Sequence, residues 1–292
     1  MLPLALALFA PAADAAPNPF RFADGDRVVL VGGTLVERAQ KYGEWELAFT
    51  LLNKDKAVTF RNLGWSGDTV WGESRGSFDG QPKGYQNLIA EVKRAEPTVL
   101  IFCYGQVESF PGSKGVPPFE AQYGKLLDAV ADTKARVVLI APPPFEDVKP
   151  MTGAAAKNAN LKLYVAATKA LAEKRKLQFV DWFSYSDPKE TKPLTENGVH
   201  MAAAGYAETA KRIYPMPLSH ADTETVATVD RLRAKIVAKN ELFFYRWRPQ
   251  NETYLFGFRK HEQGRNGKEI PQFDPLVAAA EKDIAELRAK LK

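Results

Sequence analysis

Short apolar runs alternate with longer amphipathic segments over the first 214 residues. The apolar runs are rich in Val, Ile, Leu and Phe and are four to six residues long, which predicts buried strands. They occupy residues 28–31, 58–62, 98–103, 137–140 and 178–181. The segments between them have apolar positions at helical spacing, which predicts helices. These helices are expected over residues 34–52, 85–94, 119–131, 155–174 and 202–213.

Strands that alternate with helices in this way are typical of a parallel sheet covered by helices on both faces. We therefore predict an α/β domain over residues 26–214 with a five-stranded parallel sheet. Residues 215–292 show no further strand pattern. A charged helical pattern, the aromatic stretch ELFFYRWRPQNETYLFGFRKHEQGRN and an amphipathic helix follow one another there. We interpret residues 215–292 as a helical extension of the domain.

The first 15 residues are mostly apolar and end in Ala13-Asp14-Ala15, an A-x-A cleavage pattern. The basic residues that normally precede such a run are missing. The run is also too short to span a bilayer. We interpret residues 1–15 as a signal peptide and expect an exported protein, periplasmic or extracellular, with no membrane span.

The positive charge lies in the extension. Basic and acidic side chains balance at 24 each over residues 1–210, whereas residues 211–292 hold 16 basic and 11 acidic ones. A sequence pI near 9.1 suits a nucleic-acid binder, but no nucleic-acid motif accompanies it. We therefore expect no nucleic-acid partner, and the extension is a candidate for contact with an envelope polymer or a protein partner.

The chain has few residues that hold metals or cofactors. It contains three histidines, none at H-x-x-x-H spacing, and one cysteine, Cys103, in an apolar run. The pair Gly32-Gly33 does not match the G-x-G-x-x-G pattern, and no Walker A sequence occurs. We expect neither a metal nor a cofactor, and we expect Cys103 to be buried.

Polar clusters follow three predicted strands directly, at residues 32–34, 64–68 and 104–109. A fourth cluster, residues 196–200, lies in a later loop. Sites of parallel α/β sheets lie at the carboxyl ends of the strands. We therefore expect the four clusters to converge on one crevice.

Thr34 lies in the first cluster, within the stretch VLVGGTLVER of residues 29–38. Thr34 and Glu37 have the T-x-x-E spacing of a capping box, in which the hydroxyl accepts an amide of its own helix. The other role is that of a nucleophile on a strand-to-helix turn, although the threonine methyl crowds attack and stiffens the side chain. The residues alone favour the cap.

The other clusters hold further candidates. Ser66 nearly matches G-x-S-x-G, but Asp68 replaces the second glycine, so we expect a turn there. The Gly67 amide is a candidate oxyanion donor or a positive-φ turn position. His200 precedes an Ala-rich segment and is a candidate general base.

The aromatic and acidic side chains of these loops have two interpretations each. Trp65, Trp71 and Tyr104 are candidates for stacking on a sugar ring or for core packing. Asp68 and Glu108 are candidates for substrate contact or for loop hydrogen bonding.

The order of the four clusters resembles the SGNH/GDSL hydrolase superfamily of esterases and acylhydrolases. Its blocks read Gly-Asp-Ser, Asn-x-Gly-x-Ser-Gly-Asp-Thr, Gly-x-Asn-Asp and Asp-x-x-His. The second block is matched closely by residues 62–69, NLGWSGDT, and the last by residues 197–206, NGVHMAAAGY. The resemblance implies a flavodoxin-like three-layer α/β/α sandwich. It also implies that Thr34 is the nucleophile, Gly67 an oxyanion donor, His200 the base and Asn197 its partner.

This chain departs from the pattern at several positions. Thr34 replaces the serine, Val107 the oxyanion asparagine and Asn197 the triad aspartate. Three carboxylates are candidates to replace the aspartate: Glu196, Glu108 and Asp68. The resemblance implies a hydrolase of an esterified carbohydrate or another acyl ester. The alternative is a catalytically silent module that binds an envelope glycan or a protein partner.

Overall fold

A computed structural model describes residues 18–76, 78, 80–184, 192–215 and 221–291. The predicted signal peptide, residues 1–15, lies outside these residues. The core of the fold is a five-stranded sheet of order β2-β1-β3-β4-β5, in which every pairing is parallel. Each predicted apolar run forms one strand. The strands are β1 (Arg27–Gly32), β2 (Thr59–Asn62), β3 (Val99–Cys103), β4 (Arg136–Ala141) and β5 (Gln178–Asp181).

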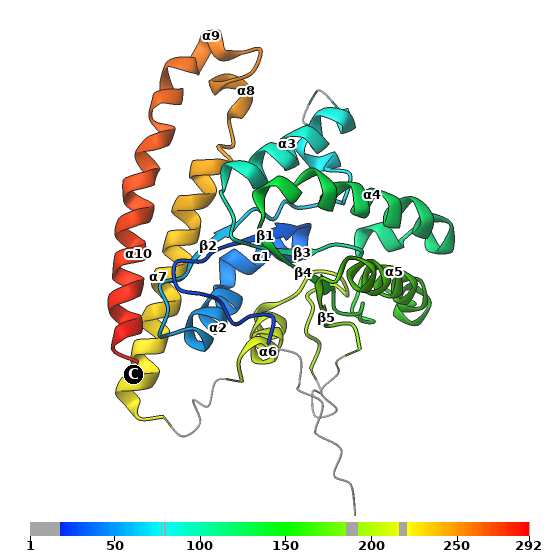
Figure 1. Cartoon of the computed structure of the whole chain (residues 1–292), viewed down its shortest axis with the longest axis horizontal. Coiled ribbons are helices and arrows are strands. Elements are labelled where there is room, and N and C mark those ends of the chain that lie inside the picture. The colour runs from blue at the N-terminus through cyan, green and yellow to red at the C-terminus, as the bar shows by residue number, and fades with distance from the viewer. Residues whose placement is uncertain (1–17, 77, 79, 185–191, 216–220, 292) are drawn as a thin grey trace, which may run out of the picture.

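Helices cover both faces of the sheet (Figure 1). One face carries α1 (Thr34–Tyr42), α2 (Glu44–Leu52) and α6 (Ala203–Ile213), and the other carries α3 (Gly80–Arg94), α4 (Val116–Ala129) and α5 (Ala154–Arg175). Alternation along β1 explains the two layers, because Val28 and Leu30 enter one core and Val29 and Val31 the other. The predicted three-layer sandwich is confirmed.

The predicted helix over residues 34–52 is two helices. Gly43 adopts φ 72° between α1 and α2, a conformation that side chains with a Cβ disfavour. The apolar spacing runs through this break and does not reveal it. Short helical turns complete the loops: η1 (Glu73–Arg75), η2 (Val107–Ser109), η3 (Gly112–Gly115) and η4 (Ala131–Thr133).

The extension consists of two long helices that lie side by side, α7 (Thr223–Trp247) and α10 (Phe273–Ala289) (Figure 1). Helix α7 packs on α1, α2 and the edge strand β2. No helix in the described ranges combines the length and the apolar character needed to cross a membrane. Short elements connect the two helices: α8 (Glu252–Leu255), α9 (Lys260–Gln263), η6 (Gly264–Lys268) and η7 (Ile270–Gln272).

A buried ion pair joins the extension to the domain. The Nζ of Lys239, on α7, lies 2.7 Å from a carboxylate oxygen of Glu46 on α2 and also donates to the carbonyl of Phe60 on β2. Asn240 donates to the same carboxylate at 3.0 Å. Burial lowers the pKa of Lys239, and the Glu46 carboxylate opposes that effect. The extension therefore packs against the domain through buried contacts and is not joined to it by the chain alone.

Removing one partner of this pair is expected to destabilise the fold. Lys239→Met leaves the Glu46 carboxylate buried without its cation, and we expect a loss of about 3–5 kcal/mol in the free energy of unfolding. Lys235→Met on the same helix removes an exposed pair with Asp283, and we expect a change below about 1 kcal/mol. Urea unfolding of the three proteins measures both effects. Equal stability of Lys239→Met and Lys235→Met would contradict the assignment.

Candidate active site

The turn after β1 places Thr34 at the first position of α1, with Gly33 as the N-cap. The helix has no side-chain cap hydrogen bond. Instead, the Thr34 Oγ1 accepts the backbone N–H of Gly67 at 2.9 Å. Glu37 accepts the backbone N–H and the hydroxyl of Ser66, at 2.8 and 2.6 Å. The predicted capping box is wrong, because a loop from outside the helix engages both side chains.

Gly33 allows this loop to approach. A Cβ at Gly33 would lie 2.8 Å from the carbonyl oxygen of Asp68, closer than real Cβ contacts. The aspartate that the resemblance places here therefore has no room in this arrangement. Gly67 itself adopts φ 74°, which suits a glycine and presents its N–H to Thr34.

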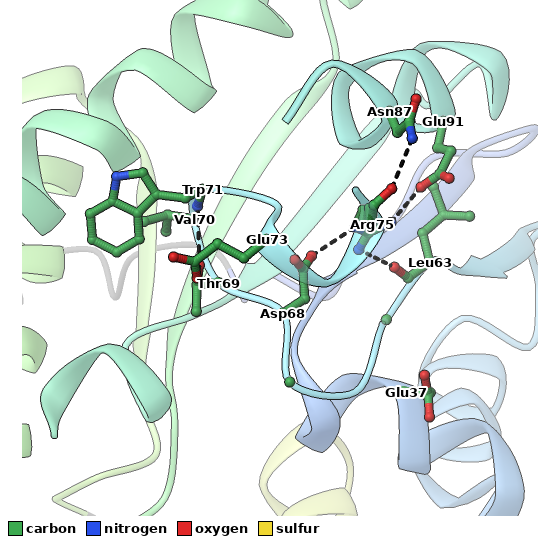
Figure 2. Close-up of polar contacts among 12 residues, drawn as sticks. Glu37, Leu63, Asp68, Thr69, Val70, Trp71, Glu73, Arg75, Asn87 and Glu91 are labelled. Carbon is green, nitrogen blue, oxygen red and sulfur yellow. Dashed lines mark hydrogen bonds and ion pairs between the residues drawn. The ribbon is translucent and has the colours of Figure 1, made fainter. Parts of the chain in front are cut away.

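The buried side chain of Arg75 holds the loop that follows β2 (Figure 2). Its Nε donates to Asp68 at 2.7 Å, and its two terminal nitrogens donate to Glu91 and to the carbonyl of Leu63. The side chains of Arg75 and Asp68 are fully buried. Burial raises the pKa of Asp68, and the charge of Arg75 opposes that rise. Arg75 thus contacts Leu63 and Asp68, which lie on either side of Gly67 in the sequence.

Glu108 joins the loop after β3 to the same segment. Its carboxylate accepts the backbone N–H groups of Gly105 and Val70, at 2.9 and 3.1 Å. Burial raises the pKa of Glu108 to about 7. Tyr104 is buried too, and its hydroxyl donates to Asp68 at 3.3 Å.

The structure revises the predicted substrate contacts. The residues Asp68, Tyr104 and Glu108 are 1, 2 and 7 % exposed, so their side chains contact the loops of the site and not solvent. The Trp65 ring is covered by the guanidinium of Arg248 at 3.6 Å and packs against Trp247. The burial of Asp68, Tyr104 and Glu108 opposes the predicted direct contact with a substrate, and the Arg248 guanidinium over the Trp65 ring opposes stacking of that ring on a sugar.

Asn197 and His200 form the last part of the site. The Asn197 Oδ1 accepts the backbone N–H groups of Val199 and His200, at 3.1 and 2.8 Å. This orients the amide so that its Nδ2 lies 3.3 Å from the His200 Nδ1. An amide NH₂ only donates, so Nδ1 accepts and the proton of the neutral ring is on Nε2. A carboxylate at Asn197 would favour the opposite tautomer.

Among the residues that the structure describes, no carboxylate takes the place of the missing aspartate. Within the described ranges, no Asp or Glu oxygen lies within 4.0 Å of a His200 nitrogen. The Glu196 carboxylate instead pairs with Arg38 at 2.6 Å and accepts the hydroxyl of Tyr42. Glu108 and Asp68 are engaged elsewhere, as described above. The three alternative carboxylates are therefore excluded as partners of His200 in this arrangement.

The structure brings Thr34 to Gly67 and Asn197 to His200, and no hydrogen bond joins the two pairs among the described residues. Val107, in η2, is partly buried and carries no side-chain donor. The remaining candidates for oxyanion donors are the N–H of Gly67 and that of Thr34, which lies in the first turn of α1 where helix amides lack helical partners. The described residues contain no cluster of three or more metal-ligating side chains.

The profile of the GDSL-like lipase/acylhydrolase family matches residues 25–208. The chain belongs to this family. Sequence comparison with curated proteins found no match. The family match ends before α7, so the extension lies outside it.

Two solved structures illustrate the shared fold. A gut microbial diltiazem-metabolizing enzyme has a TM-score of 0.50 and 17% identity, covering 69% of this chain and 48% of its own. This chain therefore spans about half the length of that protein. A catalytic mutant of an acetylxylan esterase from Geobacillus stearothermophilus has a TM-score of 0.50 and 16% identity, covering 65% of this chain and 93% of its own. At such identities the likeness shows the fold alone.

The raised pKa of Glu108 predicts a pH-dependent stability. The folded state holds the proton up to about pH 7, whereas an exposed glutamate releases it near 4.5. Folded protein therefore binds more protons over that interval, and stability falls as the pH rises through it, by about 3 kcal/mol, then stays level above pH 7.

Glu108→Gln stays neutral and should flatten this part of the profile, although the amide weakens the absolute stability because its NH₂ faces a backbone donor. Denaturant unfolding between pH 4.5 and 8 measures the slope. The exposed Glu120→Gln is the control and should keep the wild-type slope. A Glu108→Gln slope equal to that of the control would contradict the assignment.

Proposed function

We propose that this chain is a slow acyl-ester hydrolase with Thr34 as the nucleophile. The observation that carries the proposal is the 2.9 Å hydrogen bond from the Gly67 N–H to the Thr34 Oγ1. Thr34 is only partly buried and Gly67 is exposed, so a substrate can reach both. Membership in an acylhydrolase family supports the reaction class.

In the proposed reaction His200 first exchanges its proton with solvent, losing it from Nε2 and gaining one at Nδ1. The Thr34 oxygen then attacks the ester carbonyl and its proton passes to the freed His200 Nε2. The charge on the carbonyl oxygen is held by the N–H groups of Gly67 and Thr34. The alcohol leaves with the proton from His200, and water then releases the acyl group by the reverse path. Gly67 therefore exchanges its hydrogen bond to Thr34 for one to the substrate oxygen.

The Asn197 amide makes this reaction slow. In the resting arrangement the His200 Nε2 carries the proton and cannot accept another. In serine proteases the same exchange of a triad aspartate for an amide lowers kcat by about 10⁴-fold. The valine at position 107 removes a third oxyanion donor, a loss that typically costs about 10²- to 10³-fold.

For the substrate we propose a short acyl ester of a carbohydrate. The acetylxylan esterase among the similar structures motivates this choice, whereas the packed rings of Trp65 and Tyr104 do not add to it. We also propose export, on the apolar residues 1–15, which would place the protein among extracellular or envelope polysaccharides.

The alternative proposal is a binding module that has lost catalysis. The hydrogen bond from Asn197 to the His200 Nδ1 favours it, because this arrangement makes Nε2 a donor for a bound ligand instead of a base. The two proposals differ in whether the Thr34 hydroxyl forms an acyl intermediate.

We expect Asn197→Asp to raise the turnover of aryl acetates by at least about 100-fold, because a carboxylate restores the Nε2 acceptor. Thr34→Ala in either background should reduce turnover to that of buffer. Thr133→Ala, which removes a hydroxyl from η4, is the control and should match the wild type. Acetylated xylo-oligosaccharides, assayed by acetate release, test the substrate class.

The binding-module alternative gains support if wild type and Asn197→Asp both match Thr34→Ala in this assay. The hydrolase proposal is then wrong, since the tautomer is no longer the obstacle. Trapping of an acyl group on Thr34, detected by intact mass, would contradict the binding-module alternative.

A further inference from the structure

Arg248 reaches the active-site turn from the extension. It lies at the C-cap of α7, outside the family match of residues 25–208. Its guanidinium forms an ion pair with the Glu37 carboxylate on α1 and lies 3.6 Å from the centre of the Trp65 ring. The Arg248 and Glu37 side chains are 24 and 18 % exposed, so both are largely shielded from water. A planar guanidinium suits such a combined ion pair and stacking contact.

Glu37 connects Arg248 to the loop after β2 that carries Ser66 and Gly67. Its two carboxylate oxygens accept the hydroxyl and the backbone N–H of Ser66. Ser66 directly precedes Gly67, whose N–H donates to Thr34. A continuous set of polar contacts therefore connects the end of α7 to the N–H that the proposed reaction uses.

Arg248 also balances a charge. The Glu37 carboxylate, on α1, contacts Ser66, the residue that precedes Gly67. In the proposed reaction negative charge develops on the substrate oxygen at the Gly67 N–H. Two other arginines of the described residues are paired elsewhere: Arg75 with Asp68 and Glu91, and Arg38 with Glu196. Without Arg248, an unneutralised carboxylate next to the oxyanion would oppose the reaction.

We propose that Arg248 is a positioning residue of the active site. It holds Glu37 on Ser66, fixes the N–H of Gly67 toward Thr34, and neutralises Glu37 beside the oxyanion. The extension thus supplies a component that the family domain lacks. The effect on the oxyanion rests on the proposed ester hydrolysis, whereas the effect on the Gly67 N–H does not.

The positional part is tested without any activity, by NMR of the full chain labelled with nitrogen-15. Arg248→Ala should shift the Gly67 amide resonance and speed its hydrogen exchange by about 10-fold or more. The reason is that Glu37, the hydrogen-bond partner of Ser66, is no longer fixed by Arg248. Arg246→Ala is the matched control, since it removes the pair with Asp274 from the same last turn of α7. Arg248→Lys keeps the charge but not the planar stack, and should fall between the two. A Gly67 amide in Arg248→Ala that matches Arg246→Ala would overturn the proposal.

The electrostatic part is tested by kinetics in the Asn197→Asp background. Arg248→Ala should lower kcat about 10-fold with little change in KM, because the lost interaction acts on the transition state. Glu37→Gln removes the charge and keeps both contacts to Ser66, since the amide can accept from one and donate to the other.

In the Glu37→Gln protein, Arg248→Ala should therefore cost less than about 3-fold, a coupling that a double-mutant cycle measures. Equal losses in the two backgrounds would overturn the electrostatic role. If no background shows turnover, the proposed hydrolysis fails, while the NMR comparison still decides whether Arg248 positions Gly67.

Discussion

The buried ion pair of Arg75 and Asp68 is the constraint on which the site depends. Both side chains are fully removed from water, so neither is tolerable without the other. Arg75 also donates to the carbonyl of Leu63 (Figure 2). Gly67 lies in the segment between Leu63 and Arg75. The pair therefore determines where the Gly67 N–H lies, and through it the orientation of the Thr34 hydroxyl.

Outer contacts then complete the arrangement. Glu108 ties the segment to the loop after β3, and Arg248 ties it to the extension through Glu37. These contacts come from three separate parts of the chain, and they leave Thr34 and Gly67 reachable. In contrast, the His200 side of the site has changed in chemistry, because an amide replaces the carboxylate that orients the imidazole. The Gly67–Thr34 hydrogen bond and the Asn197–His200 contact are the two observed contacts on which the proposed hydrolysis rests.

Hydrophobic periodicity predicted all five strands and their parallel sheet, because a strand buried on both faces appears in the sequence as a short continuous apolar run. It missed the break at Gly43, where one backbone conformation interrupts a continuous apolar pattern. Motif spacing singled out Thr34 and Gly67, which the structure brings into contact. The capping box considers only residues of the same helix, so it did not predict that the Thr34 hydroxyl accepts an N–H from a loop distant in sequence. The burial of Glu108 and the contact of Arg248 with Glu37 depend on tertiary packing, which no local sequence pattern predicts.

The tautomer of His200 decides whether the Asn197 amide orients the imidazole as a donor to Nδ1. Nitrogen-15 NMR of the imidazole, at a pH where the ring is neutral, reports which nitrogen carries the proton. We expect a protonated Nε2 and an accepting Nδ1 in the wild type, because the Asn197 amide donates to Nδ1. We expect the opposite tautomer in Asn197→Asp. A wild-type ring with the proton on Nδ1 would show that the Asn197 amide does not donate to it.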